Sequence, residues 1–381
     1  MTITLSIPES LKPEDGRFGS GPSKIRPEQI AALDAGATTL LGTSHRQAPV
    51  KQLVASIREG LREFFHLPEG YEVALGNGGA SAFWEIACAS LITRRAAFGT
   101  YGSFSAKFAA SAANAPFLED PVLFPGEPGT YRLPELTEGV DTYCWAHNET
   151  STGVAAPIRR VAGSREAGAL TVIDGTSAAG ALPVDISQTD VYYFSPQKAF
   201  GADGGLWVAI LSPEAIDRAA GVESSAHLEG AHRWVPPFLS LTTALNNSRK
   251  DQTLNTPAVA TLIMMENQIR WLNNNNGGLA WATTRCAKSA SILYSWAERS
   301  EYAAPFVVDA DARSNAVVTI DLDERVQASQ VLSILRENGI VDAAGYRKLG
   351  RNQLRVGVFP SVEPADVMAF TKCVDYVVEH L

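Results

Sequence analysis

Short apolar runs alternate along the middle of the chain with segments of helical or loop composition. Residues 80–92 have helical spacing and follow the first of these runs. Runs this short and this apolar are typical of parallel strands buried on both faces of a sheet. The four that carry this pattern span residues 71–75, 142–146, 170–173 and 191–194. A further run at residues 205–211 follows too closely for a helical crossover, so we expect it to be antiparallel to its neighbour.

The order of elements changes near residue 256. Thr256 can be the N-cap of a helix and Pro257 can occupy its first position. Residues 258–272 are then predicted to form the helix. The Asn- and Gly-rich run at residues 273–278 indicates the end of that helix and a loop. The pattern then predicts strand, helix, strand and helix at residues 316–322, 328–338, 353–358 and 364–380. These elements predict an α+β module separate from the parallel sheet.

Composition narrows the functional classes. With 45% hydrophobic and 19% charged residues, the 381-residue chain can bury a sizeable core and is not disordered. Its net charge of −9 argues against broad binding to nucleic acid or anionic membranes, so an anionic substrate would need a local cationic pocket. The four cysteines lie far apart and predict neither a disulfide framework nor a zinc or other metal site. No apolar stretch is long enough for a membrane span and no signal peptide is recognised, so we expect a cytoplasmic protein.

Three segments could carry chemistry. The Gly-rich residues 76–81 lie between a predicted strand and helix, where backbone N–H groups and the helix N-terminus can hold a phosphate, although a plain tight turn fits as well. Lys198 follows a buried strand, where desolvation would lower its pKa and suit it to act as nucleophile or base. Asp174 ends the preceding strand and belongs at the carboxyl edge of the sheet, where ligands bind in open α/β folds.

Taken one at a time, these residues also fit ordinary structural roles: a lysine reaching solvent, a turn aspartate, a core phenylalanine. In combination they match the needs of pyridoxal 5′-phosphate. The lysine would form a Schiff base, the aspartate would keep the pyridine nitrogen protonated, and the helix start would hold the phosphate. Phe104 then offers an aromatic ring for one face of the cofactor.

At these residues the chain resembles the class V aminotransferases of the fold-type I pyridoxal-phosphate enzymes. The resemblance covers nearly the whole chain and rests on seven motifs in the family's order. They are FGSGPS at 18–23, SHR at 44–46, GNGGASAF at 76–83, HNETSTG at 147–153, DGTSA at 174–178, SPQKAFG at 195–201 and NTP at 255–257. We therefore expect an α/β fold: a large cofactor-binding domain with a mostly parallel central sheet over residues 26–267, and a smaller α+β domain over residues 1–25 and 268–381.

The resemblance implies a role for each matching residue. Lys198 would carry the cofactor and Asp174 would pair with its pyridine nitrogen. Phe104 takes the position of the stacked ring, and Thr150 that of the group beside the phenolic oxygen. Ala80, Ser81 and Gln197 match positions that bind the cofactor phosphate. Asn255 and Thr256 match the pair that the other subunit contributes to the same phosphate site. A homodimer with shared active sites is implied.

The substrate side is matched less completely. His45 and Arg46 correspond to a substrate-binding His-Arg pair, and Arg355 to the arginine that grips the substrate α-carboxylate, a task its planar guanidinium suits. A second His-Arg pair of relatives, for substrate phosphate, has no clean match, and Arg347 is our choice for its arginine. Many relatives also have Gly-Arg where this chain has Ala80-Ser81, and Trp where it has Phe104, which indicates a divergent branch that still binds the cofactor.

Within the family the motifs resemble most closely the members that convert 3-phosphohydroxypyruvate and L-glutamate to O-phospho-L-serine and 2-oxoglutarate, a step of serine biosynthesis. The related phosphorylated substrate of pyridoxine biosynthesis is a further candidate. Another class V aminotransferase, of the alanine–glyoxylate or serine–glyoxylate type, is the main alternative. A cysteine desulfurase would need a catalytic loop cysteine, a nicotinamide dehydrogenase would need glycine where Ser81 stands, and a non-catalytic binding protein would leave Lys198 and Asp174 without a joint purpose.

Overall fold

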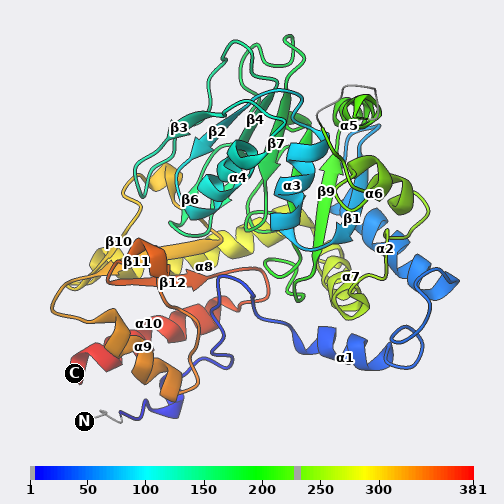
Figure 1. Ribbon diagram of the computed structural model, residues 1–381. Coiled ribbons are helices and arrows are strands. Elements are labelled where there is room, and N and C mark those ends of the chain that lie inside the picture. Colours follow the sequence, from blue (N-terminus) through cyan, green and yellow to red (C-terminus); the bar gives the residue numbers. More distant parts are fainter. Residues whose placement is uncertain (1–4, 227–232) are drawn as a thin grey trace.

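The computed structural model describes residues 5–226 and 233–381, and it is built around a seven-stranded sheet (Figure 1). The strand order is β1-β9-β8-β7-β4-β2-β3. Only β9 is antiparallel to its neighbours, as the sequence predicted, and the mostly parallel sheet is confirmed. The strands are β1 (Glu72–Asn77), β2 (Ala96–Thr100), β3 (Val122–Pro125), β4 (Thr142–Ala146), β7 (Leu170–Asp174), β8 (Val191–Phe194) and β9 (Leu206–Leu211).

The central strands are apolar throughout because helices cover both faces of the sheet. In β8, Tyr192 faces one buried core and Tyr193 the other, as the two-residue period of a strand requires. One core contains residues of α3 (Ala80–Ser90), α4 (Ser103–Asn114), α5 (Pro213–Ser225) and α6 (Leu241–Ser248). The other contains residues of α2 (Ala48–Phe64), α7 (Val259–Asn274) and the first turns of α8 (Leu279–Arg299). The helix α1 (Pro27–Ala35) packs on α7, and β5 (Asn148–Glu149) pairs with β6 (Val154–Ala155).

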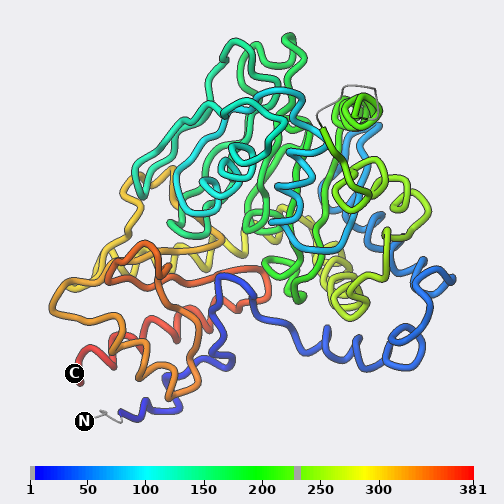
Figure 2. Tube along the Cα trace, in the orientation of Figure 1, coloured from blue at the N-terminus to red at the C-terminus, as the bar shows by residue number. Residues whose placement is uncertain are grey.

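The C-terminal part forms its own three-stranded antiparallel sheet with a separate core. Its elements are β10 (Ala303–Pro305), β11 (Val317–Leu322), β12 (Gln353–Gly357), α9 (Ala328–Glu337) and α10 (Pro364–Glu379). The N-terminal segment runs beside these elements (Figure 2), and Arg17 forms a parallel bridge with Val341.

The division into domains at residues 267 and 268 stays a prediction. Side chains of α7 pack with the large sheet along the whole helix, and Leu279 and Ala282 of α8 belong to the same core. Farther along α8, Ala290 and Leu293 belong to the core of the small sheet. On this packing we propose that the boundary lies inside α8.

The start of α7 corrects one local prediction. The helix begins at Val259 with Ala258 as its N-cap, so Thr256 is not the capping residue. The Thr256 carbonyl instead accepts a hydrogen bond from Asn77, and its hydroxyl faces His45. Tertiary contacts therefore hold this residue outside the helix. Among the described residues, no helix is long and apolar enough to cross a membrane.

Candidate active site

A cavity of about 390 Å³ opens at the carboxyl edge of the large sheet. Strands β7 and β8 end there, and α3 and α4 begin there. Because parallel strands finish at one edge, residues far apart in the sequence meet in this cavity. The predicted site residues that line it are Ala80, Ser81, Phe104, Thr150, Asp174, Gln197 and Lys198.

Lys198 is buried at the cavity wall, with 8% of its surface exposed. Its Nζ donates a 2.6 Å hydrogen bond to the carbonyl oxygen of Ser20. Desolvation, reinforced by the positive charge of Arg355, lowers the pKa of Lys198 from 10.5 to about 8. An appreciable fraction of the amine is therefore uncharged near neutral pH and can act as a nucleophile or base.

Asp174 is held by two N–H donors. Its Oδ1 accepts a 2.9 Å bond from the backbone N–H of Thr176, and its Oδ2 accepts a 3.3 Å bond from the indole N–H of Trp84. Burial raises the pKa of the Asp174 carboxyl, while these hydrogen bonds oppose that shift. A buried carboxylate at this place is suited to pair with a protonated ring nitrogen.

The Gly-rich loop lies between β1 and α3, as predicted. Gly78 and Gly79 have φ values of 121° and 81°, and Gly79 precedes the first turn of α3 with no side chain capping the helix. The free N–H groups of that turn are available to an anion at the cavity. Ala80 and Ser81 belong to the same turn.

Several buried polar atoms at this cavity have no protein partner. They include Gln197 Oε1, Asn148 Oδ1 and Thr176 Oγ1. Buried polar groups are almost always hydrogen-bonded, so these atoms indicate room for a polar ligand. A helix N-terminus, a buried lysine, a buried carboxylate and an aromatic ring around one cavity fit pyridoxal phosphate.

Phe104 and Thr150 line the same cavity from different elements. Phe104 is the second residue of α4, and its ring contacts that of Tyr346 at 5.8 Å between centroids. Thr150 donates a 2.7 Å hydrogen bond to Ser177. Glu149, next to Thr150, is fully buried and accepts hydrogen bonds from the backbone N–H groups of Phe104 and Ser105, which anchors the start of α4.

A second hollow of about 570 Å³ adjoins the first, and the two share Gly21 and Pro22. It is lined by Arg347, Lys348 and Arg355 together with Tyr346 and Asp342. Arg355 donates to the Thr150 carbonyl at 3.2 Å, while its buried Nε has no partner. Desolvation lowers the pKa of its guanidinium. This hollow is the local cationic pocket that an anionic substrate requires in a chain of net charge −9.

The other four predicted site residues do not line either hollow. His45 and Thr256 face each other at 3.2 Å, Arg46 donates to Gln252, and Asn255 accepts from Asn77. Asn77 adjoins the Gly-rich loop, so this group lies beside the cavity without entering it. Burial and the charge of Arg46 lower the pKa of His45.

Sequence reasoning missed several contributors. Trp84, Ser177 and the backbone of Ser20 contact Asp174, Thr150 and Lys198 respectively. Trp84 lies in helix α3, where an aromatic residue is expected to pack in the core. Nothing in the sequence therefore indicated a contact between Trp84 and Asp174. Ser177 lies inside a motif that did carry the resemblance, and its position there was the available signal.

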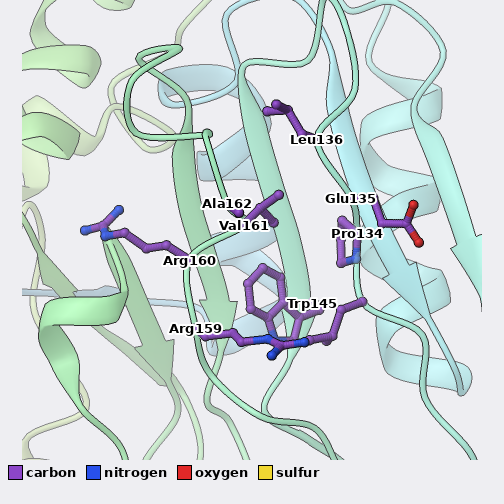
Figure 3. A pocket seen from close by; sticks show the side chains of 9 residues that line it. Pro134, Glu135, Leu136, Trp145, Arg159, Arg160, Val161 and Ala162 are labelled. Carbon is purple, nitrogen blue, oxygen red and sulfur yellow. The ribbon is translucent and has the colours of Figure 1, made fainter.

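A separate hollow of about 460 Å³ lies away from these residues, between segments 133–136 and 159–162 beside Trp145 of β4 (Figure 3). It contains no lysine, and its carboxylate, Glu135, is exposed. It therefore lacks the buried Lys–Asp combination of the cavity at the sheet edge.

Comparison with known proteins agrees with this geometry. Residues 18–348 match the family model described as aminotransferase class-V. The phosphoserine aminotransferases of Rhodococcus opacus (strain B4) and Rhodococcus jostii (strain RHA1) are each 56% identical over 381 residues, covering 100% of both chains.

Similar folds are found among solved structures. A phosphoserine aminotransferase from Cytophaga hutchinsonii aligns with a TM-score of 0.83 at 20% identity, covering 95% of this chain and 99% of that one. Pyridoxamine–pyruvate aminotransferase from Mesorhizobium loti aligns with a TM-score of 0.81 at 18% identity, covering 99% and 94%. At such identities these likenesses show the fold, while the family follows from the family model and the close relatives. This chain belongs to the class V aminotransferases, a family of pyridoxal-phosphate-dependent transaminases.

Proposed function

We propose that this enzyme is a phosphoserine aminotransferase, which exchanges the amino group of L-glutamate with the oxo group of 3-phosphohydroxypyruvate. The products are O-phospho-L-serine and 2-oxoglutarate. The observation that carries the proposal is the adjacency of two hollows, one holding Lys198 and Asp174 and the other holding Arg347, Lys348 and Arg355. Relatives at 56% identity that bear this name support it.

Pyridoxal 5′-phosphate, when bound, supplies an electron sink for the charge left at the substrate α-carbon. The first turn of α3 and Gln197 would hold its phosphate, and Asp174 would pair with its ring nitrogen. Phe104 would cover one face and the Thr150 hydroxyl would lie beside the phenolic oxygen. These assignments use only residues that line one cavity.

Lys198 would first hold the cofactor and then move protons. Its Nζ is suited to take the proton from the substrate α-carbon, because its lowered pKa leaves it partly uncharged. The N–H groups of Thr176 and Trp84 stabilise the ionised form of the Asp174 carboxyl against the effect of its burial. Lys198 and Asp174 are both buried, which strengthens their electrostatic interactions relative to those in bulk water.

We assign the substrate anions to the second hollow. Arg355 borders both Thr150 and the cation-lined hollow, so its guanidinium is placed for the α-carboxylate. Arg347 and Lys348 are exposed at the rim and are suited to the substrate phosphate. Glutamate carries a carboxylate in place of that phosphate and would use the same cations.

We also propose a homodimer in which Asn255 and Thr256 serve the partner's active site. Both residues are exposed and lie outside the cavity of their own chain. Because Thr256 contacts His45, the pair His45 and Arg46 would cross to the partner together with them.

Mixing two inactive variants tests this arrangement. In a heterodimer of Lys198→Ala with a chain carrying Asn255→Ala and Thr256→Ala, one site receives a wild-type lysine and wild-type crossing residues. Activity regained on mixing supports the shared site. No recovery in a verified heterodimer would place Asn255 and Thr256 in the site of their own chain.

The decisive experiment follows the visible absorption of the purified enzyme during addition of O-phospho-L-serine, with L-serine as the matched control. Loss of the yellow colour with phosphoserine alone is expected. A yellow protein indifferent to phosphoserine would favour another class V aminotransferase. The Lys198→Ala variant lacks the amine proposed to hold the cofactor and serves as the negative control. The phosphorylated substrate of the pyridoxine pathway can be tested in the same assay.

A cytoplasmic location, consistent with four unpaired buried cysteines, is proposed as well and is tested by cell fractionation.

A further inference from the structure

Trp84 joins the wall of the cofactor cavity to the buried carboxylate. It lies one helical turn after Ala80 on α3, so both residues face the cavity. Its indole N–H donates to Asp174 Oδ2 at 3.3 Å, and the ring is 7% exposed. An indole nitrogen can only donate, so this contact always presents a hydrogen to the carboxylate.

The ring is itself held in place. It is stacked on Phe108 of α4, with centroids 6.3 Å apart and an interplanar angle of 15°. The second carboxylate oxygen of Asp174 is held by the Thr176 backbone. These two N–H donors hold the carboxylate from different segments of the chain, and the hydroxyls of Thr176 and Tyr193 also interact with it.

We propose that Trp84 is a positioning residue that holds the ionised carboxylate of Asp174 toward the ring nitrogen of pyridoxal phosphate. The inference rests on the proposed cofactor site. A tryptophan that merely fills the core would contribute to stability without sensing the ring nitrogen of the ligand. The two roles therefore differ in what they predict for a cofactor analogue lacking that nitrogen.

The test compares binding by the apoenzyme of pyridoxal phosphate and of an analogue with CH in place of the ring nitrogen. Equilibrium dialysis gives both dissociation constants. Trp84→Phe keeps an aromatic ring and removes the donor. We expect its dissociation constant for pyridoxal phosphate to rise roughly ten-fold, the scale of one hydrogen bond to a charged group, with less than about a two-fold change for the analogue.

Trp296→Phe is the matched control, because that indole also donates to a carboxylate, Asp375, but in the small domain. It should change neither constant. Trp84→His restores a ring donor and should recover part of the affinity; it also serves if Trp84→Phe does not fold. As a second readout, kcat of Trp84→Phe should fall while KM for phosphoserine stays unchanged.

Equal weakening for both ligands, or for neither, would overturn the positioning role. These outcomes are separate from failure of the proposed function. If the wild-type apoenzyme bound neither ligand, the cofactor assignment itself would be wrong.

Discussion

Nζ of Lys198 donates a hydrogen bond of 2.6 Å to the carbonyl oxygen of Ser20, a residue 178 positions earlier in the chain. The contact ties the N-terminal segment, which runs beside the small C-terminal sheet, to Lys198 at the edge of the large sheet. It also keeps the amine close to Gly21, where both hollows meet. The lysine therefore lies close to the place where the two hollows join.

The lowered pKa of Lys198 predicts an unusual pH dependence of chemical labelling. In the cofactor-free protein, Lys198 loses its proton as the pH rises through about 8, whereas an unfolded lysine does so near 10.5. Between those values the unfolded chain binds more protons, so stability from this group also increases with pH across that window. Mass spectrometry after brief amine acylation should show Lys198 half-reactive near pH 8. A midpoint near 10.5 would contradict the desolvated environment.

Replacing Asp174 by Asn should separate charge from shape. The amide keeps the size of the carboxyl but cannot hold a proton on the ring nitrogen, so we expect kcat to fall by roughly 10²-fold or more. Steady-state kinetics with phosphoserine and 2-oxoglutarate provide the measurement. Asp185→Asn, at an exposed short-helix cap, is the control. Near wild-type turnover in Asp174→Asn would remove Asp174 from the proposed mechanism.

Arg347→Gln should weaken recognition of the substrate phosphate. The side chain is exposed at the rim of the cationic hollow, so the loss is that of one solvent-screened charge, roughly a ten-fold rise in KM for phosphoserine with little change in kcat. Arg325→Gln removes a comparable exposed arginine, paired with Asp323, and should be silent. An unchanged KM in Arg347→Gln would shift the phosphate contact to Lys348.

Gly21→Ala should disturb the lysine directly. A Cβ at Gly21 would lie 2.2 Å from Lys198 Nζ, and the φ of 134° disfavours any side chain there. We expect reduced cofactor content after purification, measured by absorbance against protein concentration. Gly221→Ala, where a Cβ meets open space, gives the baseline. Full cofactor occupancy in Gly21→Ala would show that the lysine tolerates displacement.

Glu149→Gln, which removes a single charge, should destabilise the protein. The carboxylate accepts hydrogen bonds from Phe104, Ser105 and Ser151, and an amide would direct its own N–H₂ toward some of these donors. Leaving buried donors without an acceptor should lower the unfolding free energy by about 2–3 kcal/mol. Chemical denaturation measures this, with exposed Glu138→Gln for comparison. Equal stability of the two variants would refute the anchoring of α4 by Glu149.

Local pattern was enough to predict much of the large sheet. The strands at residues 142–146 and 191–194 were predicted with the observed bounds. The antiparallel strand predicted at residues 205–211 begins one residue later, at Leu206. These predictions succeeded because a strand buried on both faces must be apolar throughout, which a short window reveals. The helix after Pro257 was placed too early because contacts of Thr256 with Asn77 and His45 come from distant parts of the chain.

The sequence by itself determined which residues could perform the chemistry: a lysine and an aspartate after buried strands, and a glycine-rich turn before a helix. These are local features, because side-chain spacing and turn composition act over a few residues. Only the tertiary structure decided that Trp84 donates to Asp174, that Ser20 holds Lys198, and that Arg355 borders the cavity through Thr150. Such contacts depend on how separate elements pack across the sheet edge, and no short stretch of sequence contains that packing.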